Sequence, residues 1–324
     1  MKVLVIGASG FLGYSIARKL REQKYEVINF SRSHPEKLAA IGVHTITGDL
    51  SSPEDIRDLF EKEKFDVVFH VGGKIAMWGD WKDFFSINYL GTKVMLELAK
   101  VHGVKKFIYT SSPSVSFGNQ DLLGVDETTA YPDKYYSMYA QSKSMAEQEV
   151  LKANSEDFLT CALRPHLIFG PGDENLIPRL LNAHRLGKLK RVGDGNNLVD
   201  VIYVENAADA HLKAFEKLTW NSGVDGKPFF IGQGPVNLWN FIDQVMEKND
   251  LPKVTKSISF NKAYTIGSII EAGLKLTGQT KIDPPMTRFV AMQLAKSHYF
   301  SHEKAQHDLG WTPKISLEDA INEL

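Results

Sequence analysis

The sequence has little of what marks secreted, membrane-spanning or metal-binding chains. Its one cysteine, Cys161, excludes an internal disulfide framework and a cysteine-rich metal site, and we expect no bound metal. No apolar run reaches the roughly 18 residues that a membrane-spanning helix needs. The apolar run at residues 3–6 ends at Gly7 with no small-residue cleavage site, which favours a buried strand over a signal peptide. We therefore expect a cytoplasmic globular protein without a transmembrane segment.

An excess of positive charge is also lacking. Lys and Arg number 38 and Asp and Glu number 39, which gives a formal net charge of −1. Because such a chain has no overall field to hold a polyanion, we expect no nucleic-acid partner. The content of 43% hydrophobic and 24% charged residues is ordinary for a folded protein, and 324 residues suffice for about two domains.

The first half of the chain alternates short apolar runs with helical patterns. Strands are predicted at residues 3–6, 25–30, 45–47, 67–69 and 107–109, with helices between them. One of these helices has its inward stripe predicted at residues 87, 90, 94 and 98. Strands that alternate with helices imply right-handed crossovers and a parallel sheet covered on both faces. The predicted fold class is therefore α/β, a doubly wound, Rossmann-type parallel sheet.

The second half is richer in turns, at residues 170–172 and 193–197, and one more strand is predicted at 199–204 with a helix at 207–215. We expect a dinucleotide-binding domain at 1–165, rejoined by about 197–217, and a smaller C-terminal substrate-binding domain at 166–324.

Gly7, Gly10 and Gly13 follow the first strand and open a helix. A dinucleotide site needs glycines here because a Cβ would block the pyrophosphate, whereas free N–H groups at the helix start bind it. Glycines also serve tight turns between strands and helices, but their position directly after the first strand favours the cofactor.

The end of the second strand indicates which dinucleotide is bound. A carboxylate there would bind the ribose 2′-hydroxyl of NAD, but the chain has Ser31 and Arg32, which suit a 2′-phosphate. We therefore predict NADP(H), although Arg32 could be an ordinary surface residue. Asp49, after Gly48, is a candidate for contact with the adenine and could equally cap a turn.

Tyr139 and Lys143 lie four residues apart, so a helix would place both on one inward face with Ala146 and Val150. An ammonium beside a phenol lowers the phenol pKa, and the phenol can then exchange a proton with an alcohol or ketone. A hydroxyl at the end of the fifth predicted strand could hold the substrate oxygen. Ser112 is the first choice for that hydroxyl and Ser111 the second.

Seven segments together resemble the extended short-chain dehydrogenase/reductase superfamily: residues 7–13, 48–50, 88–92, 109–112, 139–143, 163–165 and 170–172. The resemblance implies a catalytic triad of Ser112, Tyr139 and Lys143, with Asn88 supporting the lysine through water. It also implies that the cofactor contacts residues beyond the three glycines, namely Ser9, Phe11, Leu12, Ser31, Arg32, Asp49, Leu50, Tyr139, Lys143 and Pro165.

The tail at 297–313 is similar to the 3β-hydroxysteroid dehydrogenase-like branch, and residues 78–79, 110–115, 192–195 and 258–267 resemble the 2-alkyl-3-oxoalkanoate reductases of bacterial long-chain olefin biosynthesis. This resemblance implies NADPH-dependent reduction of the 3-keto group of a long-chain 2-alkyl-3-oxoalkanoic acid, a small lipid-like substrate. Enzymes of the olefin pathway are possible partners on the same grounds. A homodimer through the helices that carry Asn88 and Tyr139 is also implied.

A site for such an acid must hold its carboxylate, and Lys74, Arg179 and His166 are candidates. Four aromatic residues are predicted near the mouth of the pocket: Trp78, Trp81, Phe84 and Phe85. The segment Ile266–Leu276 has apolar residues at helical spacing. We expect it to face the core, with a lid over the alkyl chains or a surface for a membrane or a partner as alternatives.

Three other functions stay open. A dehydrogenase for sterols or other bulky rings would share the triad. A nucleotide-sugar epimerase usually holds NAD tightly, which Ser31 and Arg32 argue against. A non-catalytic NADP-binding regulator would tend to lose the tyrosine or the lysine, whereas this chain keeps both.

Overall fold

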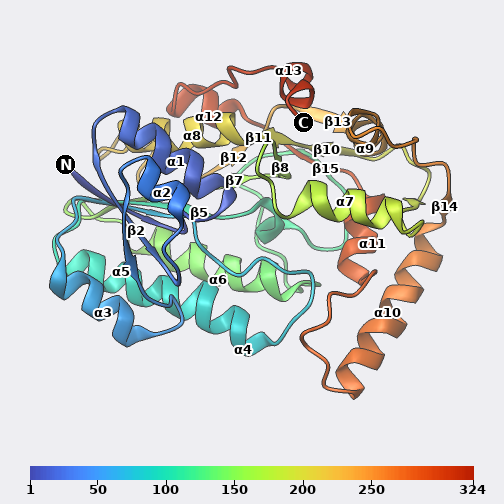
Figure 1. Ribbon diagram of the computed structural model, residues 1–324, viewed down its shortest axis with the longest axis horizontal. Coiled ribbons are helices and arrows are strands. Elements are labelled where there is room, and N and C mark those ends of the chain that lie inside the picture. Colours follow the sequence, from blue (N-terminus) through green and yellow to red (C-terminus); the bar gives the residue numbers. More distant parts are fainter.

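The computed structural model describes residues 1–324, and a seven-stranded parallel sheet forms its centre (Figure 1). The strand order is β12-β7-β5-β4-β1-β2-β3. The strands are β1 (Lys2–Ile6), β2 (Glu26–Ser31), β3 (His44–Thr47), β4 (Val67–His70), β5 (Lys106–Thr110), β7 (Leu159–Pro165) and β12 (Lys227–Ile231). The order reverses between β1 and β4, and ligands of such sheets bind beyond the carboxyl ends of the strands at this point.

Helices cover both faces of this sheet (Figure 1). On one side lie α1 (Phe11–Glu22), α2 (Glu36–Ala40) and α8 (Val204–Lys217), and on the other lie α3 (Pro53–Lys62), α5 (Gly91–Val101) and α6 (Met138–Lys152). The strands are apolar on both faces because each face packs against a helical layer; in β1, Val3 to Ile6 are all buried. The predicted α/β doubly wound class is confirmed.

The other half of the chain builds a four-stranded mixed sheet, in the order β13-β10-β15-β6, and two short strand pairs. The strands are β6 (Leu122–Val125), β8 (Ile168–Phe169), β9 (Arg191–Val192), β10 (Leu198–Asp200), β11 (Ile202–Tyr203), β13 (Pro235–Asn237), β14 (Ser257–Ile258) and β15 (His298–Phe300). The helices are α7 (Leu176–Arg185), α9 (Leu238–Lys248), α10 (Phe260–Leu276), α11 (Arg288–Ala295), α12 (Glu303–Asp308) and α13 (Leu317–Asn322).

The strand predicted at 199–204 is in fact two strands. β10 pairs with β13 and β15, whereas β11 pairs with β8, and Val201 separates them. The helix predicted at 207–215 lies within α8, which packs on α1. Two strands of the central sheet, β7 and β12, were not predicted.

The segment before α5 also differs from its prediction. A short helix α4 (Trp81–Phe84) continues into a π-helical turn η1 (Phe85–Leu90) and then into α5. The wider π-turn shifts the inward face. The buried positions are Asn88, Gly91, Thr92, Met95, Leu96 and Ala99, while Leu90 of the predicted stripe is 40% exposed.

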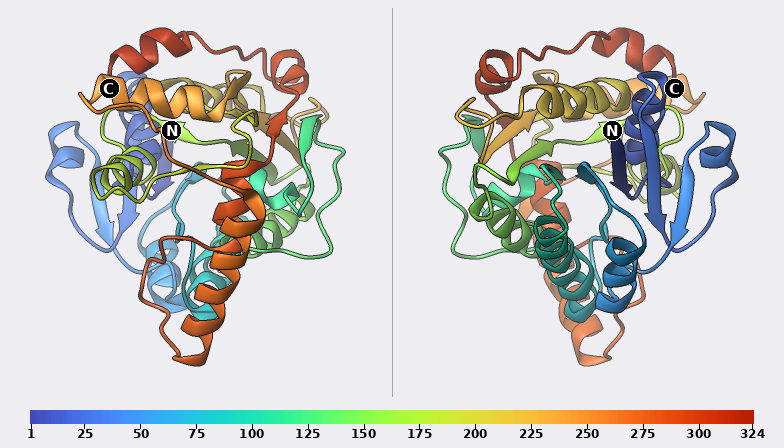
Figure 2. Two further views of the ribbon diagram at one scale, coloured as in Figure 1. Left: turned by 90° about the vertical axis from the view of Figure 1, so that its right-hand side faces the viewer. Right: turned by 90° about the vertical axis from the view of Figure 1, so that its left-hand side faces the viewer.

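Helix α10 contradicts the expectation that it faces the core. Only Ala263, Gly267 and Glu271 of its 17 residues are buried, and the helix projects from the body of the molecule (Figures 1 and 2). No helix has both the length and the apolar character needed to cross a bilayer.

Candidate active site

The loop between β1 and α1 uses its three glycines for different reasons. Gly7 has φ +82°, and a Cβ there would lie 2.6 Å from Gly72 Cα. A Cβ on Gly13 would lie 2.1 Å from the Gly7 carbonyl oxygen. Because both positions are crowded by backbone, the packing of the protein itself requires glycine at these two places.

Gly10 is different, because a Cβ there would meet only the Gly7 carbonyl oxygen at 3.4 Å. It caps α1 without a side-chain hydrogen bond, and the amides of Phe11, Leu12 and Gly13 donate to no protein acceptor. Free amides beside a bare backbone fit the pyrophosphate of a dinucleotide. Leu12 and Gly13 are buried, so their contact with such a ligand would come from the backbone, whereas Ser9 and Phe11 are half-buried.

Arg32 is exposed just after β2 and forms no ion pair or hydrogen bond within the chain. The Ser31 hydroxyl, by contrast, donates to the Ser33 carbonyl at 2.8 Å and accepts from Asn29 Nδ2 at 2.8 Å. Of the two predicted phosphate ligands, the guanidinium is therefore the one that is free.

Asp49 caps a turn, which is one of the two roles predicted for it. Its Oδ1 accepts from the backbone N–H and from the hydroxyl of Ser51, each at 2.8 Å. The backbone bond from Ser51 lowers the pKa of the Asp49 carboxyl, and the charge of Arg32 adds to the effect. The two side chains are thus close enough to interact. The carbonyl oxygen of the next residue, Leu50, packs against Gly91, and a Cβ on Gly91 would lie 2.3 Å from this oxygen.

The structure distinguishes the two serines that follow β5. The Ser111 hydroxyl is buried without a partner, and its amide donates to the Leu163 carbonyl. The Ser112 hydroxyl accepts from the Ser114 amide at 3.3 Å and lies 2.9 Å from the Ser114 hydroxyl, at the start of the 3-10 turn η2 (Pro113–Ser116). The Ser112 hydroxyl is also close enough to the Tyr139 phenol to lower its pKa. The structure therefore brings Ser112, rather than Ser111, to the tyrosine.

Tyr139 and Lys143 are on the first two turns of α6, and the predicted inward face is confirmed because Lys143, Ala146 and Val150 are buried. Burial raises the pKa of the Tyr139 phenol to about 12, and the nearby Ser112 hydroxyl opposes this rise. The predicted lowering of this pKa by Lys143 is therefore not seen. Tyr139 is a protonated phenol at neutral pH, a state from which it can donate a proton.

The Lys143 ammonium lies against β5. Its Nζ donates to the Thr110 carbonyl at 2.5 Å and lies 4.1 Å from the centre of the Tyr109 ring. Burial lowers the pKa of Lys143 to about 7, while the Glu147 carboxylate raises it. The charge of this lysine at neutral pH therefore depends on the groups around it.

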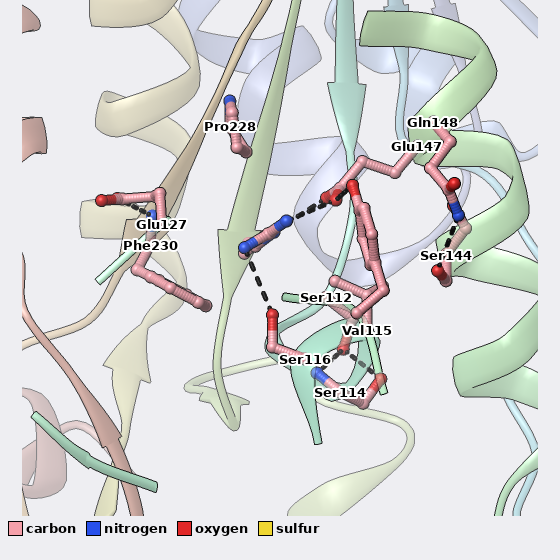
Figure 3. A network of polar contacts seen from close by, with 12 residues as sticks. Ser112, Ser114, Val115, Ser116, Glu127, Ser144, Glu147, Gln148, Pro228 and Phe230 are labelled. Atoms are coloured by element: carbon pink, nitrogen blue, oxygen red, sulfur yellow. Dashed lines mark hydrogen bonds and ion pairs between the residues drawn. The ribbon is translucent and has the colours of Figure 1, made fainter. Parts of the chain in front are cut away.

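Glu147 and Arg164 form a buried ion pair that the sequence analysis missed (Figure 3). Arg164 donates through Nε to Oε2 at 2.9 Å and through Nη2 to Oε1 at 2.6 Å, and both side chains are at most 2% exposed. The Ser116 hydroxyl accepts from Arg164, and Tyr131 donates to Glu147. Because Glu147 follows Lys143 by four residues, helical spacing alone could have indicated it. The pair fixes α6 against β7, next to the serine turn.

The side chain of Asn88 secures the loop that follows β4. Its Oδ1 accepts from the Lys74 amide at 2.7 Å, and its Nδ2 donates to the Lys74 carbonyl and to the Ser142 hydroxyl, both at 3.0 Å. Asn88 thus joins the β4 loop to α6 beside Lys143, and the backbone of its π-helical turn places it there.

The three candidates for the substrate carboxylate are not brought together. Lys74 pairs with Asp83 at 2.5 Å, and Arg179 pairs with Asp283 at 3.0 Å. His166 is buried directly after Pro165 at the end of β7, with its Nε2 2.7 Å from Nδ1 of His298.

A cleft of about 190 Å³ opens beside the start of α6. Trp78, Tyr136, Met138 and Arg288 are among its lining residues. Of the four aromatic residues predicted at the mouth, only Trp78 lines this cleft. Phe84 is fully buried, and the rings of Trp81 and Phe85 pack on each other with centres 5.7 Å apart. A larger cleft between α9 and α13 contains none of the predicted site residues.

Comparison with known proteins agrees with this arrangement. Residues 4–261 match the model of the 3-beta hydroxysteroid dehydrogenase/isomerase family. The chain is 41% identical to 2-alkyl-3-oxoalkanoate reductase of Stenotrophomonas maltophilia, over 100% of this chain and 98% of the relative. It is 38% identical to the protein of the same name in Shewanella oneidensis, over 99% of this chain and 84% of the relative.

More distant relatives share the full length as well. Human sterol-4-alpha-carboxylate 3-dehydrogenase, decarboxylating, is 33% identical over 98% of this chain and 85% of its own. Among solved structures, UDP-glucose 4-epimerase of Thermotoga maritima superimposes with a TM-score of 0.76 at 22% identity, over 99% of this chain and 96% of the epimerase.

The predicted resemblance is thereby confirmed, and the relatives are named as reductases and dehydrogenases. The chain is an oxidoreductase and belongs to the 3-beta hydroxysteroid dehydrogenase/isomerase family.

Proposed function

We propose that the protein reduces the 3-keto group of a long-chain 2-alkyl-3-oxoalkanoic acid to the 3-hydroxy acid, with NADPH as reductant. The observation that carries the proposal is the placement of Lys143 against the Thr110 carbonyl at the carboxyl end of β5, with Ser112 directly after this strand and Tyr139 one turn before the lysine on α6. It occurs in a chain that is similar over its full length to reductases named for this reaction.

The residues present fit the cofactor. The free amides of the glycine loop would hold the pyrophosphate, Arg32 the 2′-phosphate, and Tyr139 and Lys143 the nicotinamide ribose. Ser9, Leu50, Asp49 and Pro165 would line the same crevice. Bound NADPH supplies a hydride to the ketone carbon.

Tyr139 delivers the proton that the ketone oxygen needs. Its phenol stays protonated at neutral pH because burial raises its pKa to about 12. Ser112 donates a hydrogen bond to the same oxygen and so stabilises the charge that develops on it. When protonated, Lys143 favours the phenolate that remains after transfer, and Glu147 in turn supports the lysine charge.

We also propose which parts of the chain bind the cofactor and which bind the substrate. Residues 1–165, rejoined by about 197–217, would hold the cofactor, and 166–324 would complete the substrate pocket. We propose a cytoplasmic homodimer that works beside other enzymes of olefin biosynthesis. Exposed apolar residues on the outer helical layer, Leu90 (40%) and Val101 (78%), support contact between two copies there.

The test is an NADPH-oxidation assay that compares a long-chain 2-alkyl-3-keto acid with a 3-ketosteroid. We expect turnover of the keto acid and little with the steroid. Tyr139→Phe should lose about 10²-fold or more in kcat while it still binds NADPH, because it removes the proton donor. Greater activity on the steroid would overturn the substrate, and near-normal turnover by Tyr139→Phe would overturn the role of the tyrosine.

A further inference from the structure

Helix α10 is a largely apolar helix with little to cover it. Ile269 is 67% exposed, Ile266 37% and Leu276 89%, and Ile282 in the following loop is 47% exposed. In Figure 2 the helix extends beyond the rest of the molecule, with its C-terminal end outermost. Aliphatic side chains exposed together in this way mark a surface that binds a partner or a membrane.

The inner face of α10 is fully used by the protein. Its small residues, Ala263 and Gly267, let the helix approach α11 so closely that a Cβ on Gly267 would lie 2.5 Å from the Thr287 carbonyl carbon. One turn further, the buried Glu271 carboxylate accepts from the Arg288 backbone at 2.7 Å and from its guanidinium at 2.8 Å. The orientation of α10 is therefore fixed, and its exposed isoleucines cannot turn inward.

The charges of this segment are of one sign once its ion pairs are set aside. Between residues 260 and 288 the two acids are both paired, Glu271 with Arg288 and Asp283 with Arg179. The unpaired charges are Lys262, Lys275 and Lys281, all exposed. Over 251–288, six Lys and Arg against two acids give +4, which leaves −5 for the rest of a chain whose total is −1.

The C-terminal half of α10 borders the cleft beside α6. Glu271 and Lys275 line it, together with Trp78 and Met138. Trp78 also donates its indole N–H to the Gln279 carbonyl at 3.0 Å, which joins the β4 loop to the turn after α10. A partner or membrane bound to the outer face of α10 would thus lie next to this cleft.

We propose that the outer face of α10, with Ile266, Ile269, Leu276 and Ile282, docks on the surface of an anionic lipid bilayer. The apolar side chains enter the boundary between headgroups and acyl chains, and the three lysines bind lipid phosphates, as in other interfacial helices. The inference goes beyond the proposed reaction and does not depend on its substrate.

Charge favours a bilayer over a second copy of this chain. A two-fold contact would bring the same surface of both copies together, and therefore three unpaired lysines against three. Such an arrangement is repulsive, whereas an anionic headgroup layer complements it. The helix, about 25 Å long, also presents a narrow ridge rather than the broad surface that a stable protein interface needs.

The proposal can be tested by flotation of the full-length protein with vesicles of phosphatidylcholine alone or with phosphatidylglycerol added. We expect flotation with the anionic vesicles, and its loss as NaCl rises from about 0.05 to about 0.5 M, because salt screens the lysines. Ile269→Glu combined with Leu276→Glu should reduce binding about tenfold or more, since each change removes an apolar contact and adds repulsion.

The matched control is Leu123→Glu with Leu186→Glu, which adds the same charge at two other exposed aliphatic positions, 61% and 57% exposed. This control should float like the unmodified protein, and both double variants should keep its melting temperature. The proposal is overturned if the unmodified protein does not float at low salt, or if the α10 variant floats equally well. It is also overturned if the α10 variant only changes the molecular mass in light scattering, because a second copy then covers the helix.

Discussion

Arg32 is the residue on which the choice between the two cofactors depends. It is exposed at the end of β2, and no group of the chain neutralises it by an ion pair. The nearby Asp49 carboxylate is already held by Ser51. A guanidinium in this state can bind a phosphate through two parallel hydrogen bonds, which a ribose hydroxyl does not require.

We therefore expect Arg32→Glu to raise the Kd of NADPH by about tenfold or more, because a charge-assisted contact becomes a repulsion. The Kd of NADH should change little. Both can be measured by titration of nicotinamide fluorescence. Arg57→Glu, a change of an exposed arginine on α3 with no ion pair, is the matched control. Equal weakening of NADPH and NADH by Arg32→Glu would contradict specificity for the 2′-phosphate.

The proton chemistry at Tyr139 shows what a residue pattern leaves open. The spacing of Tyr139 and Lys143 predicts a shared face correctly. It does not show that the lysine donates to the Thr110 carbonyl, or that burial dominates the pKa of the phenol. Those effects depend on the distance between α6 and β5, which residues far apart in the sequence determine.

At the scale of elements, the turn between β1 and α1 contains the clearest separation of structural from binding roles. Gly13 is required by the fold, because any side chain would collide with the Gly7 carbonyl. Gly10 has ordinary extended geometry, with φ −83° and ψ 179°, and space for a methyl group. Only a ligand at the helix start gives Gly10 a reason to lack a side chain.

Gly10→Ala should therefore fold with a melting temperature close to that of the unmodified protein and bind NADPH at least about tenfold more weakly, since the methyl group meets the pyrophosphate. Gly13→Ala should instead lower the free energy of unfolding by about 2–4 kcal/mol, because backbone must move. Thermal unfolding and cofactor titration of both variants separate the two effects. If Gly10→Ala bound NADPH normally, the pyrophosphate would not lie where we place it.

The elements that the sequence predicted well are those with a local reason to form. The strands β1 to β5 are short apolar runs between turns, and α3 begins at Pro53 behind the Ser52 cap. β12 was missed because its run starts with Lys227 and Pro228, and only its pairing with β7 makes it a strand. Helix α10 was assigned to the core because periodicity reports an apolar face but not what lies against it.

For the molecule as a whole, near-zero net charge hides a strong asymmetry. The segment 251–288 carries +4 and the remainder −5. The expectation that no polyanion binds rests on the overall field, and it does not cover local sites where cations are left unpaired. Two such places are Arg32, directly after β2, and the segment of α10 and its following loop with Lys262, Lys275 and Lys281.

Two buried histidines on different elements make the stability of the whole fold depend on pH. His70, at the end of β4, and His211, on α8, are fully buried, one under each helical layer. Burial lowers the pKa of His70 to about 3 and that of His211 to about 4. His211 donates through Nδ1 to the Ala207 carbonyl at 2.7 Å, so in its neutral form Nε2 accepts from the Thr110 hydroxyl of β5 at 2.9 Å. In the unfolded chain both would titrate near 6.5.

Because the unfolded state binds these protons and the folded state does not, stability is lost as pH falls below about 6.5. Between pH 7 and 5 each histidine should lower the free energy of unfolding by about 2 kcal/mol. This amount follows from integrating the proton uptake of an unfolded-state histidine with a pKa of about 6.5. Urea denaturation at successive pH values measures the slope. His70→Phe should reduce that slope by about 1.4 kcal/mol per pH unit near pH 5, whereas His34→Gln, at an exposed position on the surface, should not. If the free energy of unfolding does not change from pH 7 to 5, these histidines are accessible to water in the folded protein. The packing of β4 and β5 against their helices would then differ from the packing described here.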